Sequence, residues 1–299
     1  MESFDALFKQ ASALAEPVGV AAAGGADTTV IQALDVARRR GWVRPILTGD
    51  VDQIREMAAG IDVDLSQFEL IPDDAGSAFA AVKCVHEGRA ELLMKGQIPT
   101  PSLMKAILQR EGGLRTGKTI CQVVLMEIPR DDRRFLMTDT GVTVDPTPQQ
   151  LTDILQSAIG IAHKLGESEP RVALMAATEK VTDLMPDTLV ADELTQRAAA
   201  GEFGACHVQG PLSFDLAYAV DASNKKGIGG GVAGAANAMV FPNLLSANLT
   251  VKGIMYTADC RFGGVLAGTS APVVFMSRAD SVDTRLNSLA YAIRLVRGR

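Results

Sequence analysis

The chain has 299 residues, of which 47% are hydrophobic and 5% aromatic, and its formal net charge is −6 at pH 7. This length is enough for two domains of ordinary size. The acidic balance argues against a general polyanion-binding surface, and the low aromatic content argues against nucleic-acid binding by base stacking. A small anionic ligand is still compatible with this composition, because it needs only a few local donors.

The sequence shows no feature of a membrane-spanning, secreted or zinc-binding protein. No apolar run approaches the roughly 18 residues that a membrane span requires, and the segment that follows Met1 lacks the basic region of a secretion signal. The four cysteines (Cys84, Cys121, Cys206 and Cys260) show neither CxxC pairing nor zinc-site spacing. We therefore expect reduced thiols in a cytoplasmic protein that contacts no membrane and binds no metal.

Short apolar segments alternate with amphipathic segments along the first hundred residues. The pattern predicts strands at 18–23, 45–49, 68–71 and 91–94, with helices at 27–40, 51–59 and 76–87. Such alternation is typical of a parallel sheet with right-handed crossovers. In sheets of this kind, ligands gather at the carboxyl ends of the strands.

The alternation returns after residue 145. Helices are predicted at 149–165, 186–200 and 215–222, and strands at 172–176, 206–209 and 238–241. Between the two halves, residues 120–128 and 134–137 are predicted to form neighbouring antiparallel strands. No internal repeat is visible, so an α/β fold without repeats is expected.

Polar segments follow several of the predicted strands. Lys95 and Gly96 come just after one strand, Thr100 and Pro101 suit the N-cap and first position of a helix, and Lys105 lies in its first turns. Taken alone, this segment is more simply a capped helix with solvated lysines. The glycine run 229–231 next to two lysines is compatible with an anion nest, but it lacks the GxxxxGK[ST] pattern of a P-loop.

The last strand leads into a charged, hydroxyl-rich turn. The apolar run 273–276 is followed by Ser277 and Arg278, and a helix then starts with Ser281 as its N-cap and Asp283 in its first turn. Helix capping explains Ser281 and Asp283, but it does not explain Ser277 and Arg278. A guanidinium suits a bidentate grip on phosphate. From this segment alone, a phosphate site and a simple capped helix are equally compatible.

Taken together, these segments resemble the phosphate acetyltransferase and phosphate butyryltransferase family, which interconverts acyl-CoA plus phosphate with acyl phosphate plus CoA. The resemblance runs in the same order from about residue 76 to the C-terminus. Its Lys-Gly and Gly-Pro-Leu segments look more like the butyryl branch than the acetyl branch. The segments that carry it are Leu93-Met94-Lys95-Gly96, Thr138-Asp139, Gly210-Pro211-Leu212, Phe214-Asp215, Lys226-Gly227-Ile228, Val232-Ala233-Gly234, Phe241-Pro242, Asn248 and Ser277-Arg278-Ala279-Asp280-Ser281.

The resemblance implies two three-layer α/β domains with a cleft between them, similar to isocitrate and isopropylmalate dehydrogenases, and a homodimer. Chain order places the first, discontinuous domain at 1–140 plus 265–299 and the inserted second domain at 141–264. The implied partners are acyl-CoA and inorganic phosphate, with coenzyme A as a co-substrate and no separate cofactor. Phosphate is expected to attack the acyl-CoA carbonyl directly in a ternary complex.

The resemblance also assigns roles to individual residues. The implied catalytic residues are Ser277, Arg278 and Asp283. Thr284 stands where the acetyl branch has an aspartate thought to be the base for the CoA thiol, so Asp283, one residue earlier, is the candidate. The implied substrate-binding residues are Lys95, Thr100, Lys105, Arg115, Asp139, Gly210, Lys226, Asn248 and Asp280.

The sequence departs from the family pattern elsewhere too. Asn237 and Asn243 stand at positions that are acidic in the butyryl branch, and Cys121-Gln122 replaces a Ser-His pair. Two alternatives to a phosphate butyryltransferase therefore stay open, namely a phosphate acetyltransferase and a diverged, non-catalytic acyl-CoA-binding protein. A metal-dependent hydroxyacid dehydrogenase is disfavoured, because the sequence shows no clustered aspartates for a divalent cation.

Overall fold

The computed structural model describes residues 1–73, 76–275, 277 and 280–298. They form two compact units. The first unit consists of Phe4–Lys118 and Phe262–Arg299, and the inserted unit consists of Met1–Ser3 and Thr119–Arg261. The sequence placed the divisions at 140/141 and 264/265, so the predicted antiparallel strand pair falls in the inserted unit instead of the first. None of the described helices has the length and apolarity needed to cross a bilayer.

The strands of the first unit follow the order β3 (Glu69–Pro72), β2 (Val43–Gly49), β1 (Val18–Ala23), β4 (Leu92–Lys95), β11 (Val273–Val274) and β10 (Arg261–Ala267). The first five of these strands pair in parallel, and β10 pairs antiparallel with β11. The chain steps from β1 outward to β2 and β3, and then returns to the other side of β1 as β4. The sheet therefore has a topological switch point between β1 and β4, which is where open α/β sheets bind ligands.

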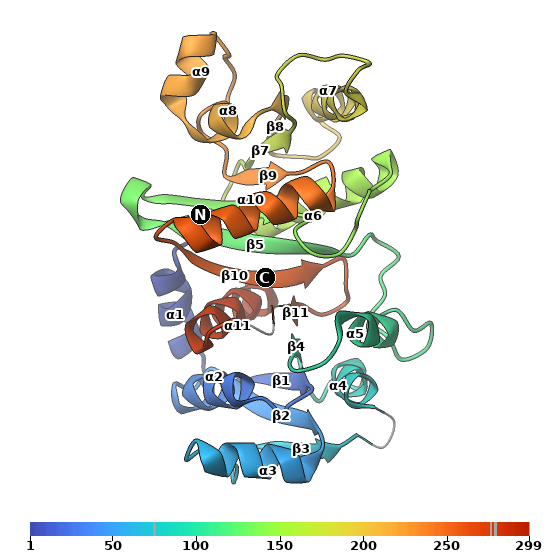
Figure 1. Cartoon of the computed structure of the whole chain (residues 1–299), viewed down its shortest axis with the longest axis vertical. Helices are drawn as coiled ribbons and strands as arrows, with labels where there is room; N and C mark the ends of the chain where they lie inside the picture. Colours follow the sequence, from blue (N-terminus) through green and yellow to red (C-terminus); the bar gives the residue numbers. More distant parts are fainter. Residues whose placement is uncertain (74–75, 276, 278–279, 299) are drawn as a thin grey trace. The chain divides into compact units, whose positions relative to one another are not determined.

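The helices of this unit cover both faces of its strands. They are α1 (Phe4–Ser12), α2 (Thr28–Arg39), α3 (Val51–Gly60), α4 (Ser77–His86), α5 (Thr100–Ile107) and α11 (Val282–Arg297). Helices α1 and α2 pack against α11, whereas α4 packs against β1, β2 and α5 (Figure 1). Right-handed crossovers that step in opposite directions from β1 place α2 and α4 on opposite faces. All six residues of β1 are buried between these layers.

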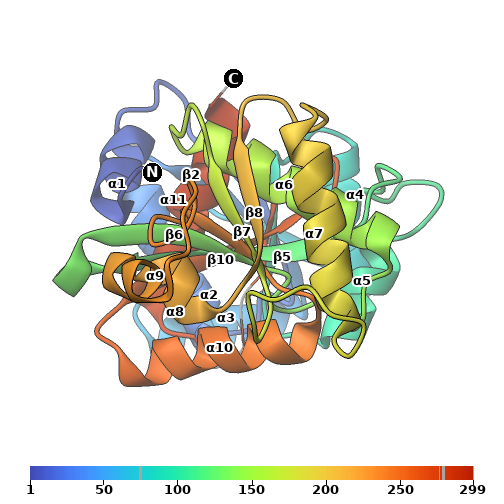
Figure 2. The same cartoon turned by 90° about the horizontal axis from the view of Figure 1, so that it is seen from above.

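The inserted unit has the strand order β5 (Cys121–Ile128), β6 (Arg133–Thr138), β9 (Ala238–Val240), β7 (Arg171–Met175) and β8 (His207–Leu212). Strands β5 and β6 pair antiparallel, as predicted, and the remaining pairs are parallel. Helices α6 (Pro148–Lys164) and α10 (Leu244–Thr257) lie on opposite sides of these strands (Figure 2). The other helices are α7 (Pro186–Ala199), α8 (Phe214–Tyr218) and α9 (Val220–Lys226).

Other sequence-based predictions also differ from the structure. Segment 215–222 is not one helix, because Ala219 has extended backbone angles and separates α8 from α9. The strand predicted to end at residue 209 continues to the end of β8, so Gly210 lies within the strand instead of after it. Helix α5 starts at Thr100 with Pro99 in the N-cap position, so Thr100 is not the cap.

Candidate active site

A lysine lies at the switch point of the first unit. Lys95 is the last residue of β4 and pairs in register with Ala23 at the end of β1. Its side chain is only 4% exposed, and its Nζ lies 3.4 Å from the carbonyl oxygen of Gly96. The simpler prediction of a solvated lysine is therefore wrong for Lys95. A lysine so deeply buried is costly, which makes this position a candidate for substrate contact.

Two glycines allow the segments after β1 and β4 to touch. The Gly96 N–H donates to the carbonyl oxygen of Ala23 at 2.8 Å, and the Gln97 N–H donates to that of Gly24 at 2.9 Å. A Cβ atom on Gly96 would overlap the Gly24 carbonyl oxygen, and Gly24 itself has a φ of +76°. Only glycine satisfies both conditions. The segments directly after β1 and β4 thus pack backbone against backbone beside Lys95.

Two hydroxyl residues that the sequence did not single out hold this edge in place. Thr48, at the end of β2, donates to the carbonyl oxygen of Ser77 at 2.8 Å, and Ser77 donates to that of Thr48 at 3.1 Å. The Ser77 hydroxyl also accepts the N–H of Gly24. Both side chains are buried. Isolated Ser and Thr residues carry no sequence signal for such a role, because they are as common in turns as in sites.

The turn after β11 is closed by Asp280. The N–H of Ser277 donates to Asp280 Oδ2 at 2.6 Å, and the Asp280 N–H donates to the Ser277 carbonyl oxygen at 3.2 Å. Ser281 then caps α11 as predicted, since its Oγ accepts the N–H of Thr284 at 3.2 Å. Arg278 lies outside the described residues. Because β4 and β11 are adjacent and parallel, Lys95 at the end of β4 and Ser277 after β11 lie toward the same edge of the sheet.

The other predicted residues of this unit lie nearer the surface. Thr100 and Lys105 are on α5, which follows β4, and Lys105 is exposed. Arg115 is exposed and forms an isolated antiparallel bridge with Thr269. Asp283 is exposed in the first turn of α11. Their roles in substrate binding or catalysis stay predictions.

In the inserted unit, Asp139 is a buried carboxylate with its own set of donors. Its Oδ1 accepts the N–H groups of Gln122 at 2.9 Å, Gly141 at 3.0 Å and Val142 at 3.1 Å, and its Oδ2 accepts that of Thr143 at 2.7 Å. Burial raises the pKa of Asp139, and the four amide hydrogen bonds oppose that rise. Since a carboxylate has about four acceptor sites, this arrangement favours a structural role for Asp139. Its predicted substrate contact is untested.

Local packing also explains why position 210 is a glycine. A Cβ atom on Gly210 would come within 2.8 Å of the Leu174 carbonyl oxygen, so a side chain would push β8 away from β7. Asn248 of α10 donates from Nδ2 to the Thr140 carbonyl oxygen at 3.0 Å. Both residues therefore stabilise the inserted unit, whatever they contribute to substrate binding.

Lys226 lies in a small surface ion network. Its Nζ is 3.7 Å from both Glu179 Oε2 and Asp215 Oδ2. The two carboxylates partly satisfy the ammonium group, and the site is solvent-exposed, so the network contributes little stability.

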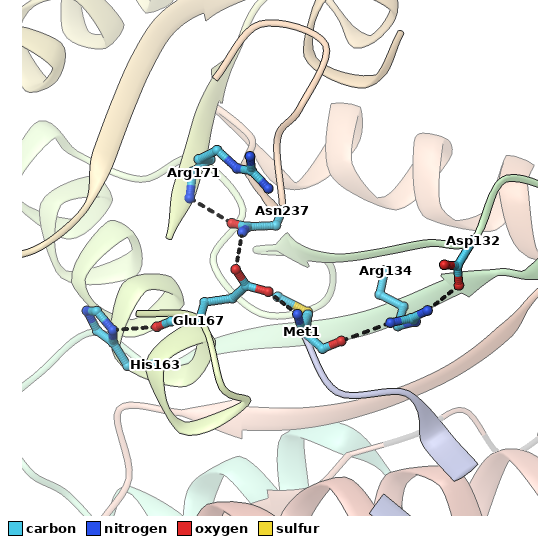
Figure 3. Close-up of polar contacts among 7 residues, drawn as sticks. All are labelled: Met1, Asp132, Arg134, His163, Glu167, Arg171 and Asn237. Atoms are coloured by element: carbon cyan, nitrogen blue, oxygen red, sulfur yellow. Dashed lines mark hydrogen bonds and ion pairs between the residues drawn. The ribbon is translucent and has the colours of Figure 1, made fainter. Parts of the chain in front are cut away.

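The departure at Asn237 has a structural explanation. Asn237 Oδ1 accepts the N–H of Arg171 at 2.7 Å, while its Nδ2 donates to Glu167 Oε2 at 2.9 Å (Figure 3). Glu167 is also paired with the ammonium group of Met1. An aspartate at position 237 would place a second carboxylate against Glu167 without a donor between them. The amide therefore fits this network, and its presence says nothing against activity.

The remaining departures also fill structural positions. Asn243 is the N-cap of α10 and accepts the N–H of Ser246 at 2.9 Å. Gln122 accepts the Thr140 hydroxyl at 3.1 Å. Cys121 is fully buried, and burial raises the pKa of its thiol to about 12. A thiol in this state is a poor nucleophile. In the described ranges, no cluster of three or more His, Cys, Asp or Glu residues could hold a metal ion.

A glycine-lined edge with a buried lysine, at the switch point of a parallel sheet, is typical of α/β proteins that bind small charged ligands. Residues 74–293 match the family described as "Phosphate acetyl/butaryl transferase". The chain belongs to this family, and the resemblance seen in the sequence is confirmed.

Individual relatives agree with this assignment. The chain is 38% identical over 275 residues to a phosphate butyryltransferase of Clostridium acetobutylicum, covering 91% of each chain. It is 36% identical over 291 residues to a phosphate acetyltransferase of Rhizobium meliloti, covering 97% of this chain and 92% of the relative. A solved branched-chain phosphotransacylase from Enterococcus faecalis V583 superposes with a TM-score of 0.83 at 30% identity, covering 94% of this chain and 99% of the other. The predicted α/β fold class is confirmed.

Proposed function

We propose that this protein is a phosphate acyltransferase that interconverts short-chain acyl-CoA plus inorganic phosphate with acyl phosphate plus CoA. The observation that carries the proposal is the common edge formed by Lys95, Gly96 and Ser277 at the ends of adjacent strands of the first unit. Because the chain belongs to the phosphate acetyl/butyryl transferase family, we assign the acyl transfer to phosphate to this edge. The butyryl-type sequence features favour butyryl-CoA or a similar short acyl chain over acetyl-CoA.

In the proposed reaction, an oxygen of inorganic phosphate attacks the thioester carbonyl carbon within a ternary complex. A C–O bond forms, the C–S bond breaks, and the proton of the phosphate passes to the leaving thiolate. The anion must be desolvated and aimed, which the Arg278 guanidinium, the Lys95 ammonium and the strand-end amides are suited to do. Much of the acceleration would come from proximity and orientation. Ser277 would donate a hydrogen bond to the developing oxyanion or to phosphate.

The reverse reaction needs a base for the CoA thiol. Asp283 is the proposed base, because Thr284, which stands at the family's aspartate position, is buried and has no carboxylate. Asp283 is exposed in the adjacent position of the same helical turn. No separate cofactor is proposed, with coenzyme A acting only as a co-substrate.

The proposed setting is a homodimer in the cytoplasm. Leu245, Leu249 and Tyr256 are 69%, 64% and 83% exposed, and their spacing places them along one face of α10. Such an exposed apolar stripe is typical of an interface. We call it the α10 stripe. The free thiols at the four cysteine positions are compatible with a reducing compartment.

A thiol-release assay tests the proposed function. Acetyl-, propionyl-, butyryl- and isobutyryl-CoA are compared with and without inorganic phosphate, and arsenate replaces phosphate as a second acceptor. We expect release that depends on phosphate or arsenate, with a higher kcat/KM for the four-carbon substrates. Preference for acetyl-CoA would reassign the protein to the acetyl type. The absence of acceptor-dependent release with every substrate would refute the proposal and favour a non-catalytic acyl-CoA-binding protein.

A further inference from the structure

A pocket of about 240 Å³ lies at the amino ends of β6, β7 and β9 in the inserted unit. Arg133 and Arg171 are the first residues of β6 and β7, and Asn237 directly precedes β9. These strands are parallel, so their amino ends meet at one edge of the sheet. None of the residues that line the pocket belongs to the first unit. The function proposed above gives this pocket no role.

A continuous chain of polar contacts frames the pocket. The N–H of Arg171 donates to Asn237 Oδ1 at 2.7 Å, and Asn237 Nδ2 donates to Glu167 Oε2 at 2.9 Å. Glu167 pairs with the ammonium group of Met1, and the Met1 carbonyl oxygen accepts from Arg134 Nη1 at 3.2 Å (Figure 3). Segments that are far apart in the sequence are thereby fixed around the pocket, so its shape is set before a ligand binds.

Arg133 is held at the pocket by the protein backbone. Its Nη1 donates to the Tyr218 carbonyl oxygen at 2.8 Å, and its Nη2 donates to that of Ala236 at 3.0 Å. The guanidinium also lies over the Tyr218 ring, 4.7 Å from the ring centroid. Asp131, two residues earlier, pairs with Arg130 and not with Arg133. Because the partners of Arg133 are neutral, they fix its position and leave its charge uncompensated.

The pocket has an excess of positive charge. Both of its carboxylates are already paired, Glu167 with the amino terminus and Asp132 with Arg134. Among the described residues, neither Arg133 nor Arg171 forms an ion pair, and no hydrogen bond involves the guanidinium of Arg171. Two uncompensated cations at one pocket repel each other, and a bound anion would relieve that repulsion.

Size and chemistry narrow the class of ligand. The pocket is smaller than the roughly 300–1,000 Å³ that drug-sized ligands occupy, so a nucleotide or coenzyme A is too large. The exposed guanidinium of Arg171 can grip an oxyanion with two parallel hydrogen bonds. A phosphate group brings about two negative charges at pH 7 and enough oxygens to contact more than one guanidinium. A single carboxylate brings half that charge.

We propose that this pocket binds a small phosphorylated anion, which Arg171 grips and the fixed charge of Arg133 attracts. Strand β6 separates the pocket from the predicted substrate contact at Asp139, since Arg133 and Thr138 are about 17 Å apart along an extended strand. The site is therefore a second anion site of this chain, built from other residues than the turn after β11.

The test is isothermal titration calorimetry with glycerol 3-phosphate at constant ionic strength, because this phosphate monoester has no acyl group to transfer. Arg171→Gln removes the unpaired guanidinium, and Arg171→Lys keeps its charge. Arg55→Gln is the matched control, since Arg55 is exposed on α3 and only weakly paired with Asp52 at 3.5 Å. We expect Arg171→Gln to weaken binding about tenfold or more, Arg171→Lys about threefold, and Arg55→Gln less than about twofold.

Arg278→Ala should bind glycerol 3-phosphate like the wild type, because Arg278 belongs to the turn after β11. Binding that is lost in Arg278→Ala and kept in Arg171→Gln would overturn the inference. The absence of binding to the wild type would also overturn it, as would equal affinity for the dicarboxylate succinate. If Arg171→Gln does not fold, Arg171→Lys decides, and a wild-type affinity refutes the idea. Since binding is measured without turnover, a failure here leaves the proposed acyltransferase function untouched.

Discussion

The carboxylate of Asp139 accepts the main-chain N–H of Gln122 at 2.9 Å, which ties the turn after β6 to the start of β5. Three further amides of the turn 141–143 complete its coordination. Asp139→Asn would leave one acceptor oxygen and turn an NH2 group toward amide donors. We expect a loss of about 2–3 kcal/mol in the free energy of unfolding, measured by urea denaturation. The exposed control Asp145→Asn should change it by less than about 0.5 kcal/mol, and equal stabilities of the two variants would contradict a structural role for Asp139.

Lys95→Met should lower the activity of the protein without lowering its thermal stability. The substitution replaces a buried ammonium by an apolar group of similar length, so we expect an unchanged or higher thermal midpoint. Because the charge at the sheet edge is lost, kcat/KM for phosphate should fall by about tenfold or more. Lys83→Met is the control, since Lys83 is exposed and only weakly paired with Glu87. A Lys95→Met protein with wild-type kinetics would remove Lys95 from the proposed site.

The cysteines should be dispensable for catalysis. Burial raises the pKa of Cys121 to about 12, so at pH 8 only about one thiol in 10,000 is ionised. In the folded protein, we expect iodoacetamide to modify the partly exposed Cys206 and Cys260 before Cys121, with thiol-release activity retained. Peptide mass spectrometry locates the adducts. Loss of activity in parallel with modification of Cys121 would support a covalent route instead.

The sequence predicted the periodic parts of this fold well, for a physical reason. Strands such as β1 and helices such as α2 are buried on regular faces, which leave a clear pattern. Helix α10 was missed because its exposed face is as apolar as its buried one. Strand β10 was missed because it carries two glycines, and Gly263 is required there, since a Cβ would come within 2.9 Å of the Ser288 backbone nitrogen.

The candidate site was only partly predictable. Motif order located Lys95 and Ser277, because both come at or shortly after the carboxyl end of a strand. The sequence could not show that Lys95 is buried, or that Asp139 already has four amide donors. The pocket beside Arg171 was missed altogether, because its lining comes from segments far apart in the sequence. Burial depends on how distant segments pack, and local patterns do not report it.

The α10 stripe makes the oligomeric state testable. Analytical ultracentrifugation of the wild type should give twice the 31.5 kDa chain mass. Leu245→Lys combined with Leu249→Lys should shift the protein toward the monomer, because charges would be buried in an apolar interface. Leu108→Lys, on an exposed leucine of the first unit, is the matched control. A monomeric wild type, or a double variant that stays dimeric, would exclude this stripe as the interface.

The most direct test of the central claim is the phosphate dependence of thiol release in the wild type and in Arg278→Ala, at saturating butyryl-CoA. If the turn after β11 binds phosphate, the wild type should saturate with phosphate, and Arg278→Ala should lose about 100-fold or more in kcat/KM for phosphate. The thermal midpoint should stay unchanged. Wild-type release that is independent of phosphate, or an Arg278→Ala variant with the same phosphate saturation curve, would contradict the account.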